Sequence, residues 1–231
     1  MKYKDIFFDL DHTLWDFETN SSLTLEALFN EYDLTVRDIP SFADFHAVYK
    51  EHNHRLWDKY SKGLIKQDEL RWKRMAYSLL DFKIGDEKLA KEMSARYLTI
   101  LPDQKALFEY SIEILNYLQN KGYRLHIVSN GFEEVQHNKL IKSGIKKYFS
   151  TIITSEGCNA TKPNKEIFEA ALHAAGAIVS ESIMIGDNPE ADIQGAINAG
   201  MDSILVNHTN ISTLILSTYT ITHLKELEDI L

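Results

Sequence analysis

The stretch "DIFFDLDHTLW", residues 5–15, holds the pattern from which the fold is deduced. An apolar run ends in two aspartates, Asp9 and Asp11, with one leucine between them. On an extended chain, residues two apart point to the same side, so both carboxylates would face one spot. Two close anions repel each other, so the pair either makes ordinary turn hydrogen bonds or belongs to a site with cations. The motif alone favours ordinary turn hydrogen bonds, and the rest of the chain decides between the two explanations.

The segment after residue 101 predicts a parallel α/β sheet, because apolar strand patterns alternate there with helical ones. The expected strands cover residues 124–130, 150–155, 182–187 and 203–207, and the expected helices cover 107–120, 133–144, 163–176 and 191–200. The apolar run before Asp9 has the same buried β character and no strand partner near it in the sequence. We therefore expect this run to join the sheet.

Between about residues 21 and 101 the pattern is helical only. Apolar and aromatic side chains recur there at steps of three and four, as in Phe42, Phe45, Tyr49, His52, Leu56 and Tyr60. We therefore predict an α/β protein whose core, residues 1–16 and 101–231, holds a parallel sheet flanked by helices. An all-helical domain of about four helices, residues 17–100, is inserted into it.

The composition is that of an ordinary globular protein, with 44% hydrophobic and 26% charged residues. A formal charge of −9 argues against a nucleic-acid polymer as partner. The single cysteine, Cys158, forms no internal disulfide, which fits a reducing compartment. The N-terminal apolar run is too short for a signal peptide, and no segment predicts a membrane span. We expect a cytoplasmic protein without a membrane partner; the sequence holds no signal for its oligomeric state.

Polar residues gather at the expected strand ends, where open α/β sheets bind their ligands. Three segments supply them at strand ends, namely Asp9 and Asp11, Ser129 and Asn130, and Asp187; Lys162, just before an expected helix, is the fourth segment at this edge. Each has an ordinary explanation when taken alone, since Ser129 suits a turn, Lys162 suits the surface, and the segment after Asp187 suits a helix cap. All four in this order at strand ends are hard to explain by chance.

The acidic groups Asp9, Asp11 and Asp187 form an oxygen-rich site that suits Mg²⁺ together with a substrate phosphate. Such an ion also offsets the repulsion between the carboxylates. Asp9 is placed to attack phosphorus and form an aspartyl-phosphate. Asp11 is placed to protonate the leaving oxygen and then to take a proton from the water that hydrolyses this intermediate.

A transferring phosphoryl group carries spread negative charge, so the site also needs hydrogen-bond donors and a cation. The Ser129 hydroxyl and the backbone N–H groups around Asn130 and Gly131 are candidate donors. The ammonium of Lys162 is the candidate cation. The predicted reaction is therefore the hydrolysis of a small phosphate monoester.

The ordered motifs "DLDHT" (residues 9–13), "SNG" (129–131), "KPNKEIF" (162–168) and "GDNPEAD" (186–192) resemble the haloacid dehalogenase superfamily of phosphohydrolases. The resemblance spans almost the entire chain and implies a Rossmann-like core with the helical insert as its sole large cap. It also implies that Asp9 is the nucleophile and Asp11 the general acid and base. Mg²⁺ would be held by Asp9, Asp187 and the main-chain carbonyl of Asp11, with Asp192 acting behind these ligands or through a water. Ser129 and Lys162 would bind the phosphate.

Within that superfamily, Asp11 favours phosphate chemistry over the displacement of halide from carbon. Phosphoglucomutase-like members typically carry glycine at the position of His12, so His12 argues against a phosphomutase without excluding it. The runs "DLDHTLWDFETN", "SNGF" and "KPNKEIF" and the helical cap look most like pyrimidine 5'-nucleotidases. That resemblance implies substrates such as dUMP, UMP and dTMP, whereas the run "SEGCNATKP" beside Lys162 departs from the relatives' pattern.

Substrate choice is expected in the cap, because the core contacts mainly the phosphate. Asn53 and Arg74 are the candidates for binding the edge of a base, while most cap aromatics at helical spacing suit the cap's own core. Two alternatives stay open: a sugar-phosphate phosphatase or phosphomutase of the same superfamily, and a catalytically idle binding module of the same fold.

Overall fold

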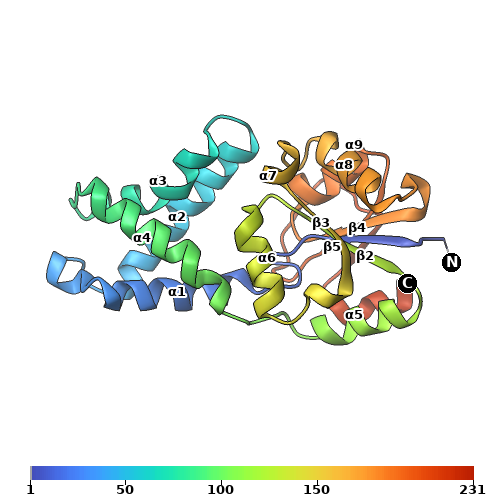
Figure 1. The fold of residues 1–231 in the computed structure, drawn as a ribbon, viewed down its shortest axis with the longest axis horizontal. Helices are drawn as coiled ribbons and strands as arrows, with labels where there is room; N and C mark the ends of the chain where they lie inside the picture. The colour runs from blue at the N-terminus through green and yellow to red at the C-terminus, as the bar shows by residue number, and fades with distance from the viewer. Residues whose placement is uncertain (1) are drawn as a thin grey trace. The chain divides into compact units, whose positions relative to one another are not determined.

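Six parallel strands form one sheet in the computed structural model, which describes residues 2–231 (Figure 1). They are β1 (Asp5–Phe8), β2 (Arg124–Ser129), β3 (Phe149–Thr154), β4 (Ser182–Gly186), β5 (Asp202–Val206) and β6 (Tyr219–Ile221). Their order across the sheet is β3-β2-β1-β4-β5-β6, which confirms the predicted parallel sheet. β6 is absent from the prediction, because only one of its three residues is buried and it carries no apolar run.

Helices flank the sheet on both faces, as predicted. They are α5 (Ser111–Asn120), α6 (Glu133–Lys142), α7 (Ser155–Cys158), α8 (Lys165–Ala175), α9 (Gly195–Asn198) and α10 (Leu227–Ile230). Figure 1 shows α8 and α9 on one side of the strands and α5 on the other. The apolar strands are therefore covered twice, which explains why they read as continuous apolar runs.

The core between the sheet and α8 consists of side chains with almost no exposed surface, including Phe7, Val128, Phe168 and Met184. They come from β1, β2, α8 and β4, so one cluster joins the first strand to segments much further along the chain. Burying each such side chain stabilises the fold by about 1.5–3 kcal/mol relative to leaving it in water.

Two helices differ from their predicted bounds. The helix expected from residue 107 begins at Ser111, because the preceding segment pairs with the start of the chain: Phe108 N donates to Leu14 O at 3.0 Å. The helix expected over 191–200 is a π-helical segment, Pro189–Gln194, followed by α9. Its first turn is capped by Asn188, whose side-chain oxygen accepts from Ala191 N at 2.9 Å.

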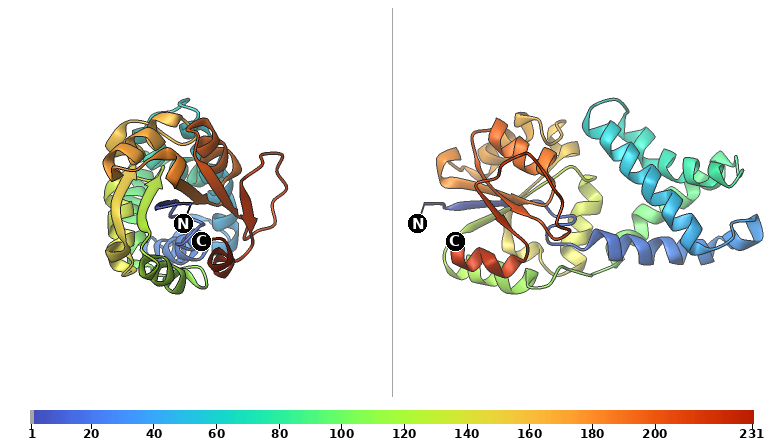
Figure 2. Two further views of the ribbon diagram at one scale, coloured as in Figure 1. Left: turned by 90° about the vertical axis from the view of Figure 1, so that its right-hand side faces the viewer. Right: turned by 180° about the vertical axis from the view of Figure 1, so that it is seen from behind.

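Contacts between Cα atoms divide the chain into two units, Met1–Phe17 with Lys105–Leu231, and Glu18–Gln104. The second unit contains most of α1 (Phe17–Glu31) and all of α2 (Phe42–Ser61), α3 (Gln67–Asp81) and α4 (Glu87–Ile100), and no strand occurs within it. Figure 2 shows these four helices from two further directions. No helix within residues 2–231 combines the length and the apolar character needed to cross a membrane.

The helical unit has its own aromatic core and capped helices. Ser41 accepts from Asp44 N at the start of α2, and the Asp86 side chain accepts from Leu89 N at the start of α4. The ring of Tyr49 on α2 lies 5.7 Å from that of Tyr97 on α4. The three- and four-residue periodicity of the sequence thus places its apolar stripe between helices.

The strand order also fixes where a ligand site can form. β1 lies between β2 and β4, so the chain leaves it toward one half of the sheet and later returns to the other half. Ligands of such sheets bind beyond the carboxyl ends of the strands at this point of reversal. Asp9 follows β1, Ser129 ends β2, and Asp187 follows β4 closely.

Candidate active site

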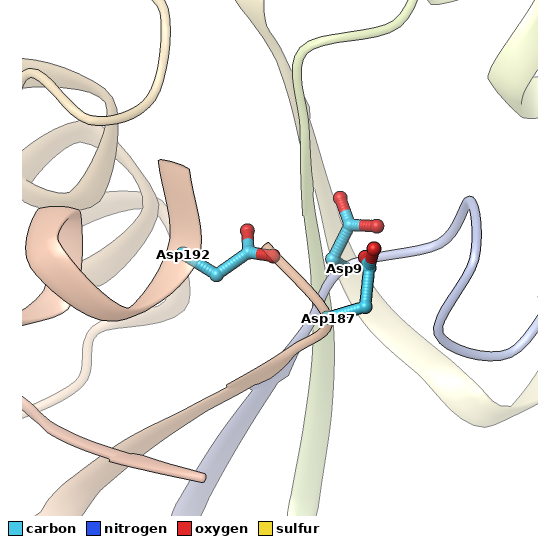
Figure 3. Close-up of side chains that lie close together, drawn as sticks. All are labelled: Asp9, Asp187 and Asp192. Carbon is cyan, nitrogen blue, oxygen red and sulfur yellow. The ribbon is translucent and has the colours of Figure 1, made fainter. Parts of the chain in front are cut away.

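Three carboxylates meet at the carboxyl ends of β1 and β4. Asp9 follows β1 directly, and its N–H donates to Ile185 O of β4 at 2.9 Å. One carboxylate oxygen from each of Asp9, Asp187 and Asp192 lies within 4.8 Å of the other two. Figure 3 shows Asp9 and Asp187 side by side, with Asp192 pointing toward them from the helical segment after β4. The family resemblance implies that Asp192 acts behind the ligands or through a water, and its carboxylate lies beside those of Asp9 and Asp187.

Asp192 reaches the cluster because β4 ends in a glycine. A Cβ atom at Gly186 would lie 2.3 Å from the Asp192 carboxyl carbon, closer than any side chain allows. The carboxylate is fixed further by Asn188, whose N–H donates to Asp192 Oδ2 at 3.0 Å. The motif "GDNPEAD" therefore builds a turn and delivers a fully buried carboxylate to the end of the sheet.

Lys162 is the cation of this cluster. Its Nζ donates to Asp9 Oδ1 at 2.5 Å, to Asp192 Oδ1 at 2.6 Å and to Val128 O at 2.9 Å. The side chain is 2% exposed. All three hydrogens of the ammonium thus have acceptors, and the lysine links β1, β2 and the segment after β4.

Asn130 holds the backbone of Lys162 in place. The Asn130 side chain donates to Lys162 O at 3.0 Å and accepts from Lys162 N at 2.7 Å. This reciprocal pair explains why an asparagine follows β2, because its amide fixes the backbone of Lys162. The amide oxygen and one amide N–H therefore bind the protein rather than a phosphate.

Ser129 has an unusual pattern of hydrogen bonds. Its Oγ accepts from Gly131 N at 3.0 Å and from Gln136 Nε2 at 2.7 Å. The Gly131 N–H, which the sequence offered as a phosphate donor, is therefore used within the loop. The hydroxyl hydrogen of Ser129 has no acceptor within residues 2–231, so it is available to an added anion.

Asp11 forms an isolated β-bridge with Trp15 and lies directly before a turn. His12 adopts a left-handed conformation with φ of 62°, which redirects the backbone after β1. The carboxylate of Asp11 accepts from Lys139 and Gln136, whereas that of Asp9 accepts from Lys162. The two carboxylates that the sequence placed at one spot thus bind different cations.

Burial and crowding of the carboxylates change their proton affinities. Burial raises the pKa of Asp9 to about 7, an effect that Lys162 opposes and that Asp192 and Asp11 reinforce. Burial also raises the pKa of Asp187 well above its usual range, with Asp192 and Asp9 adding to the effect. Burial lowers the pKa of Lys162, but Asp192 and Asp9 raise it, and the net direction is upward. The cluster is short of positive charge.

The donor set fits a hard divalent cation. Three carboxylates supply only oxygen atoms, and Mg²⁺ prefers such ligands. One ammonium balances three acidic groups, so a bound divalent ion would remove the remaining repulsion. Thr13 adds a further support, because its hydroxyl donates to Asp187 Oδ1 at 3.2 Å and orients that carboxylate.

Sequence reasoning missed Gln136 and Lys139, which hold Asp11. Lys139 Nζ lies 2.7 Å from Asp11 Oδ1, and Gln136 Nε2 lies 3.0 Å from Asp11 Oδ2. Polar residues on a helix are normally expected in solvent. The sequence near α6 gives no signal for their burial, because it depends on Asp11, which lies 125 and 128 positions away.

Asn53 and Arg74, the predicted substrate residues, are joined to each other within the helical unit. Arg74 Nη1 donates to Asn53 Oδ1 at 2.9 Å, and Nε donates to Leu70 O at 3.0 Å. Arg74 is 3% exposed, and its guanidinium lies 5.9 Å from the Trp57 ring. The bond uses the oxygen of the Asn53 amide, so the N–H groups of this amide remain as donors.

The chain matches the family model for haloacid dehalogenase-like hydrolases over residues 3–200. It is 33% identical to the pyrimidine 5'-nucleotidase PynA of Streptococcus pneumoniae, with 100% of this chain and 96% of that protein covered. It is 32% identical to a glyceraldehyde 3-phosphate phosphatase of Methanothermobacter thermautotrophicus, with 88% and 85% covered.

Among solved structures, the crystal structure of YfnB from Bacillus subtilis, bound to magnesium, matches with a TM-score of 0.89. The two sequences are 30% identical, and the match covers 100% of this chain and 99% of that one. The family model, the relatives and the fold agree over most of the chain's length. The chain belongs to the haloacid dehalogenase-like hydrolases, as a phosphatase of that superfamily.

Proposed function

We propose that this protein is a Mg²⁺-dependent phosphomonoester hydrolase that works through an aspartyl-phosphate on Asp9. The observation that carries the proposal is the position of Asp9. Its buried carboxylate lies at the end of the central strand, 2.5 Å from the Lys162 ammonium and beside Asp187 and Asp192. A nucleophile, a phosphate-binding cation and the acidic groups of a metal site thus share one place.

In the first half of the reaction, a carboxylate oxygen of Asp9 attacks phosphorus and the bond from phosphorus to the ester oxygen breaks. Asp11 gives a proton to that oxygen, so the product leaves as a neutral alcohol. In the second half, Asp11 takes a proton from a water that attacks the aspartyl-phosphate. The bond from phosphorus to Asp9 breaks, and inorganic phosphate and the free carboxylate are formed.

Ser129 and Lys162 stabilise the charge on the phosphoryl oxygens in both halves. Asp9, Asp187 and the main-chain carbonyl of Asp11 would hold Mg²⁺, with Asp192 behind them or linked through a water. When bound, the ion offsets the negative charge of these carboxylates and of the phosphate.

The proposed substrates are pyrimidine nucleoside monophosphates, in a cytoplasmic setting. Similarity to a named pyrimidine 5'-nucleotidase over the whole chain supports this choice. We further propose that residues 1–16 and 101–231 act as the catalytic core and 17–100 as the cap that selects the substrate. Asn53, oriented by Arg74, offers amide N–H groups that suit the carbonyl oxygens of a pyrimidine base.

A sugar-phosphate phosphatase is the second candidate, because a relative of almost equal identity is named a glyceraldehyde 3-phosphate phosphatase. A phosphomutase would share the first half-reaction and pass the phosphoryl group to a second hydroxyl. An idle binding module is disfavoured, because Asp9, Asp11, Lys162 and Asp187 are all present.

The experiment is a measurement of phosphate release with Mg²⁺ from dUMP, UMP, dTMP, purine monophosphates and sugar phosphates. Preference for the pyrimidine monophosphates supports the proposed substrate. Preference for sugar phosphates is consistent with the proposed reaction of Asp9 but contradicts the proposed pyrimidine substrate. No turnover on any of them, with the protein folded and Mg²⁺ present, overturns the hydrolase proposal.

A further inference from the structure

Helix α6 buries two polar side chains that the reaction described above does not use. Gln136 is 0% exposed and Lys139 is 2% exposed, whereas the apolar Ile141 on the same helix is 53% exposed. Residues three apart lie on the same face of a helix, so Gln136 and Lys139 point in a common direction. The helix therefore turns an amide and an ammonium toward the protein interior and leaves an isoleucine in solvent.

Lys139 fixes the carboxylate of Asp11. Its Nζ donates to Asp11 Oδ1 at 2.7 Å and to Asp11 Oδ2 at 2.9 Å. The ammonium also lies 4.3 Å from the centre of the Trp15 ring and 5.4 Å from that of Phe17. A cation is attracted to the face of an aromatic ring, so both rings stabilise the ammonium at this position.

Gln136 links the same carboxylate to Ser129. Its Nε2 donates to Asp11 Oδ2 at 3.0 Å and to Ser129 Oγ at 2.7 Å. The amide must face this way, because its oxygen would be repelled by the carboxylate. Ser129 Oγ also accepts from Gly131 N, so both of its lone pairs are used and its hydrogen is left to donate.

The local structure is built around this amide at some cost. A Cβ atom at Gly131 would lie 2.5 Å from the carboxamide carbon of Gln136, so the loop needs a glycine there. Gln136 Oε1 is buried without a hydrogen-bond partner within the described part of the chain. Burying an unpaired acceptor destabilises a fold. A side chain kept for stability alone would be apolar at this position.

We propose that Lys139 and Gln136 are positioning residues that set the general acid and base Asp11 and the phosphate donor Ser129 in one geometry. This inference rests on the proposed function, because it assigns Asp11 to proton transfer and Ser129 to the phosphate. Lys139 orients the carboxylate relative to the leaving oxygen. Gln136 couples that orientation to the direction of the Ser129 hydroxyl hydrogen.

The proposal has a signature that depends on the leaving group. An alkoxide is a strong base and needs a proton as it leaves, whereas p-nitrophenolate is a weak base and leaves without one. A displaced Asp11 therefore slows hydrolysis of an alkyl phosphate much more than hydrolysis of p-nitrophenyl phosphate. A general loss of structure would slow both esters alike. The value of kcat/KM reports this difference, because it covers the steps up to release of the alcohol.

The test compares Lys139→Met with wild type and with Lys142→Met, an exposed position on the same helix. The two substrates are the best alkyl phosphate of the panel and p-nitrophenyl phosphate. We expect Lys139→Met to lower kcat/KM for the alkyl ester by roughly 10²-fold more than for the aryl ester. Lys142→Met should leave both values near those of wild type. An equal loss on both esters with Lys139→Met overturns the positioning role.

Gln136→Met provides a second test in case Lys139→Met does not fold. It removes the amide without a large change in volume, so we expect an unchanged or higher Tm together with lower kcat/KM. A lower Tm with unchanged activity means that Gln136 serves stability and overturns its part in the proposal. A wild-type enzyme that hydrolyses neither ester overturns the proposed function, and this inference with it.

Discussion

The Lys162 ammonium lies 2.5 Å from Asp9 Oδ1 and 2.6 Å from Asp192 Oδ1, so one buried cation joins Asp9, the proposed nucleophile, to an acidic group 183 residues further along the chain. Removing the side-chain ammonium leaves buried carboxylates without their partner. We expect Lys162→Met to abolish turnover and to lower the free energy of unfolding by about 3–5 kcal/mol. Urea unfolding measures the second effect.

The matched control for this variant is Lys165→Met, three residues away. Lys165 pairs with Glu169 at 3.0 Å, but both side chains are 56% exposed. Exposed pairs contribute little to stability. Lys165→Met should therefore leave unfolding and turnover nearly unchanged, and a Lys162→Met protein as stable as this control contradicts the assigned role.

Asp9→Asn tests the nucleophile. The amide oxygen still accepts a hydrogen bond from Lys162, so we expect the fold and Tm to be retained. An amide does not attack phosphorus, so turnover should fall by at least roughly 10³-fold. Phosphate release and thermal unfolding give the two readings, with the exposed Asp229→Asn as control. Activity of Asp9→Asn near that of wild type contradicts the assignment of Asp9 as the nucleophile.

Removal of the metal should stop turnover reversibly. Asp9, Asp187 and Asp192 carry more negative charge than Lys162 balances, so a bound Mg²⁺ favours the folded state. We expect a chelator to abolish phosphate release and added Mg²⁺ to restore it. Mg²⁺ should also raise the Tm of wild type more than that of Asp187→Asn. Turnover that persists in excess chelator contradicts the site.

The fold was largely predictable because parallel strands covered on both faces read as continuous apolar runs. β1 and β4 are buried at every position, and both were recognised in this way. β6 was not, because its three residues depend on pairing with β5 rather than on an apolar pattern. The π-helical segment Pro189–Gln194 was read as an ordinary helix, since its geometry depends on tertiary contacts of Asp192.

The site was predictable where a residue ends a strand. Asp9, Ser129 and Asp187 all lie at the carboxyl edge of the sheet, and that edge follows from the alternation of strands and helices. Gln136 and Lys139 were not predictable, because their burial is decided by Asp11, which lies 125 and 128 positions away in the sequence. Helical periodicity alone assigns such polar residues to solvent.

The pair of Asn53 and Arg74 provides a test of substrate choice. Arg74 uses the Asn53 oxygen, so the remaining N–H groups suit carbonyl oxygens of a base. We expect Asn53→Ala to lower kcat/KM for the preferred nucleotide by roughly 5- to 10-fold, the loss of about one hydrogen bond. Hydrolysis of p-nitrophenyl phosphate should be unaffected. The neighbouring exposed His54→Ala is the control, and equal losses on both substrates exclude base recognition by Asn53.

His126 makes the stability of the fold depend on pH. It lies away from the acidic cluster of the candidate active site. Its Nε2 lies 3.0 Å from Asp5 Oδ1, and both side chains are 1% exposed. Burial lowers the pKa of His126 below 6.5, an effect that Asp5 opposes and Arg124 assists. The unfolded chain then binds a proton near pH 6.5 that the folded chain does not, so stability present above this pH is lost as the pH falls.

We expect the free energy of unfolding of wild type to fall by about 1 kcal/mol between about pH 7.5 and pH 5.5, relative to that of His126→Gln. Glutamine keeps a donor for Asp5 and does not titrate, so the difference between the two proteins isolates the imidazole. This comparison matters because burial raises the pKa of Asp9 to about 7, which stabilises the folded chain as the pH falls. If the free energies of unfolding of the two proteins, measured by urea unfolding, change equally with pH, the pKa of His126 is the same in the folded and the unfolded chain. That outcome contradicts the prediction.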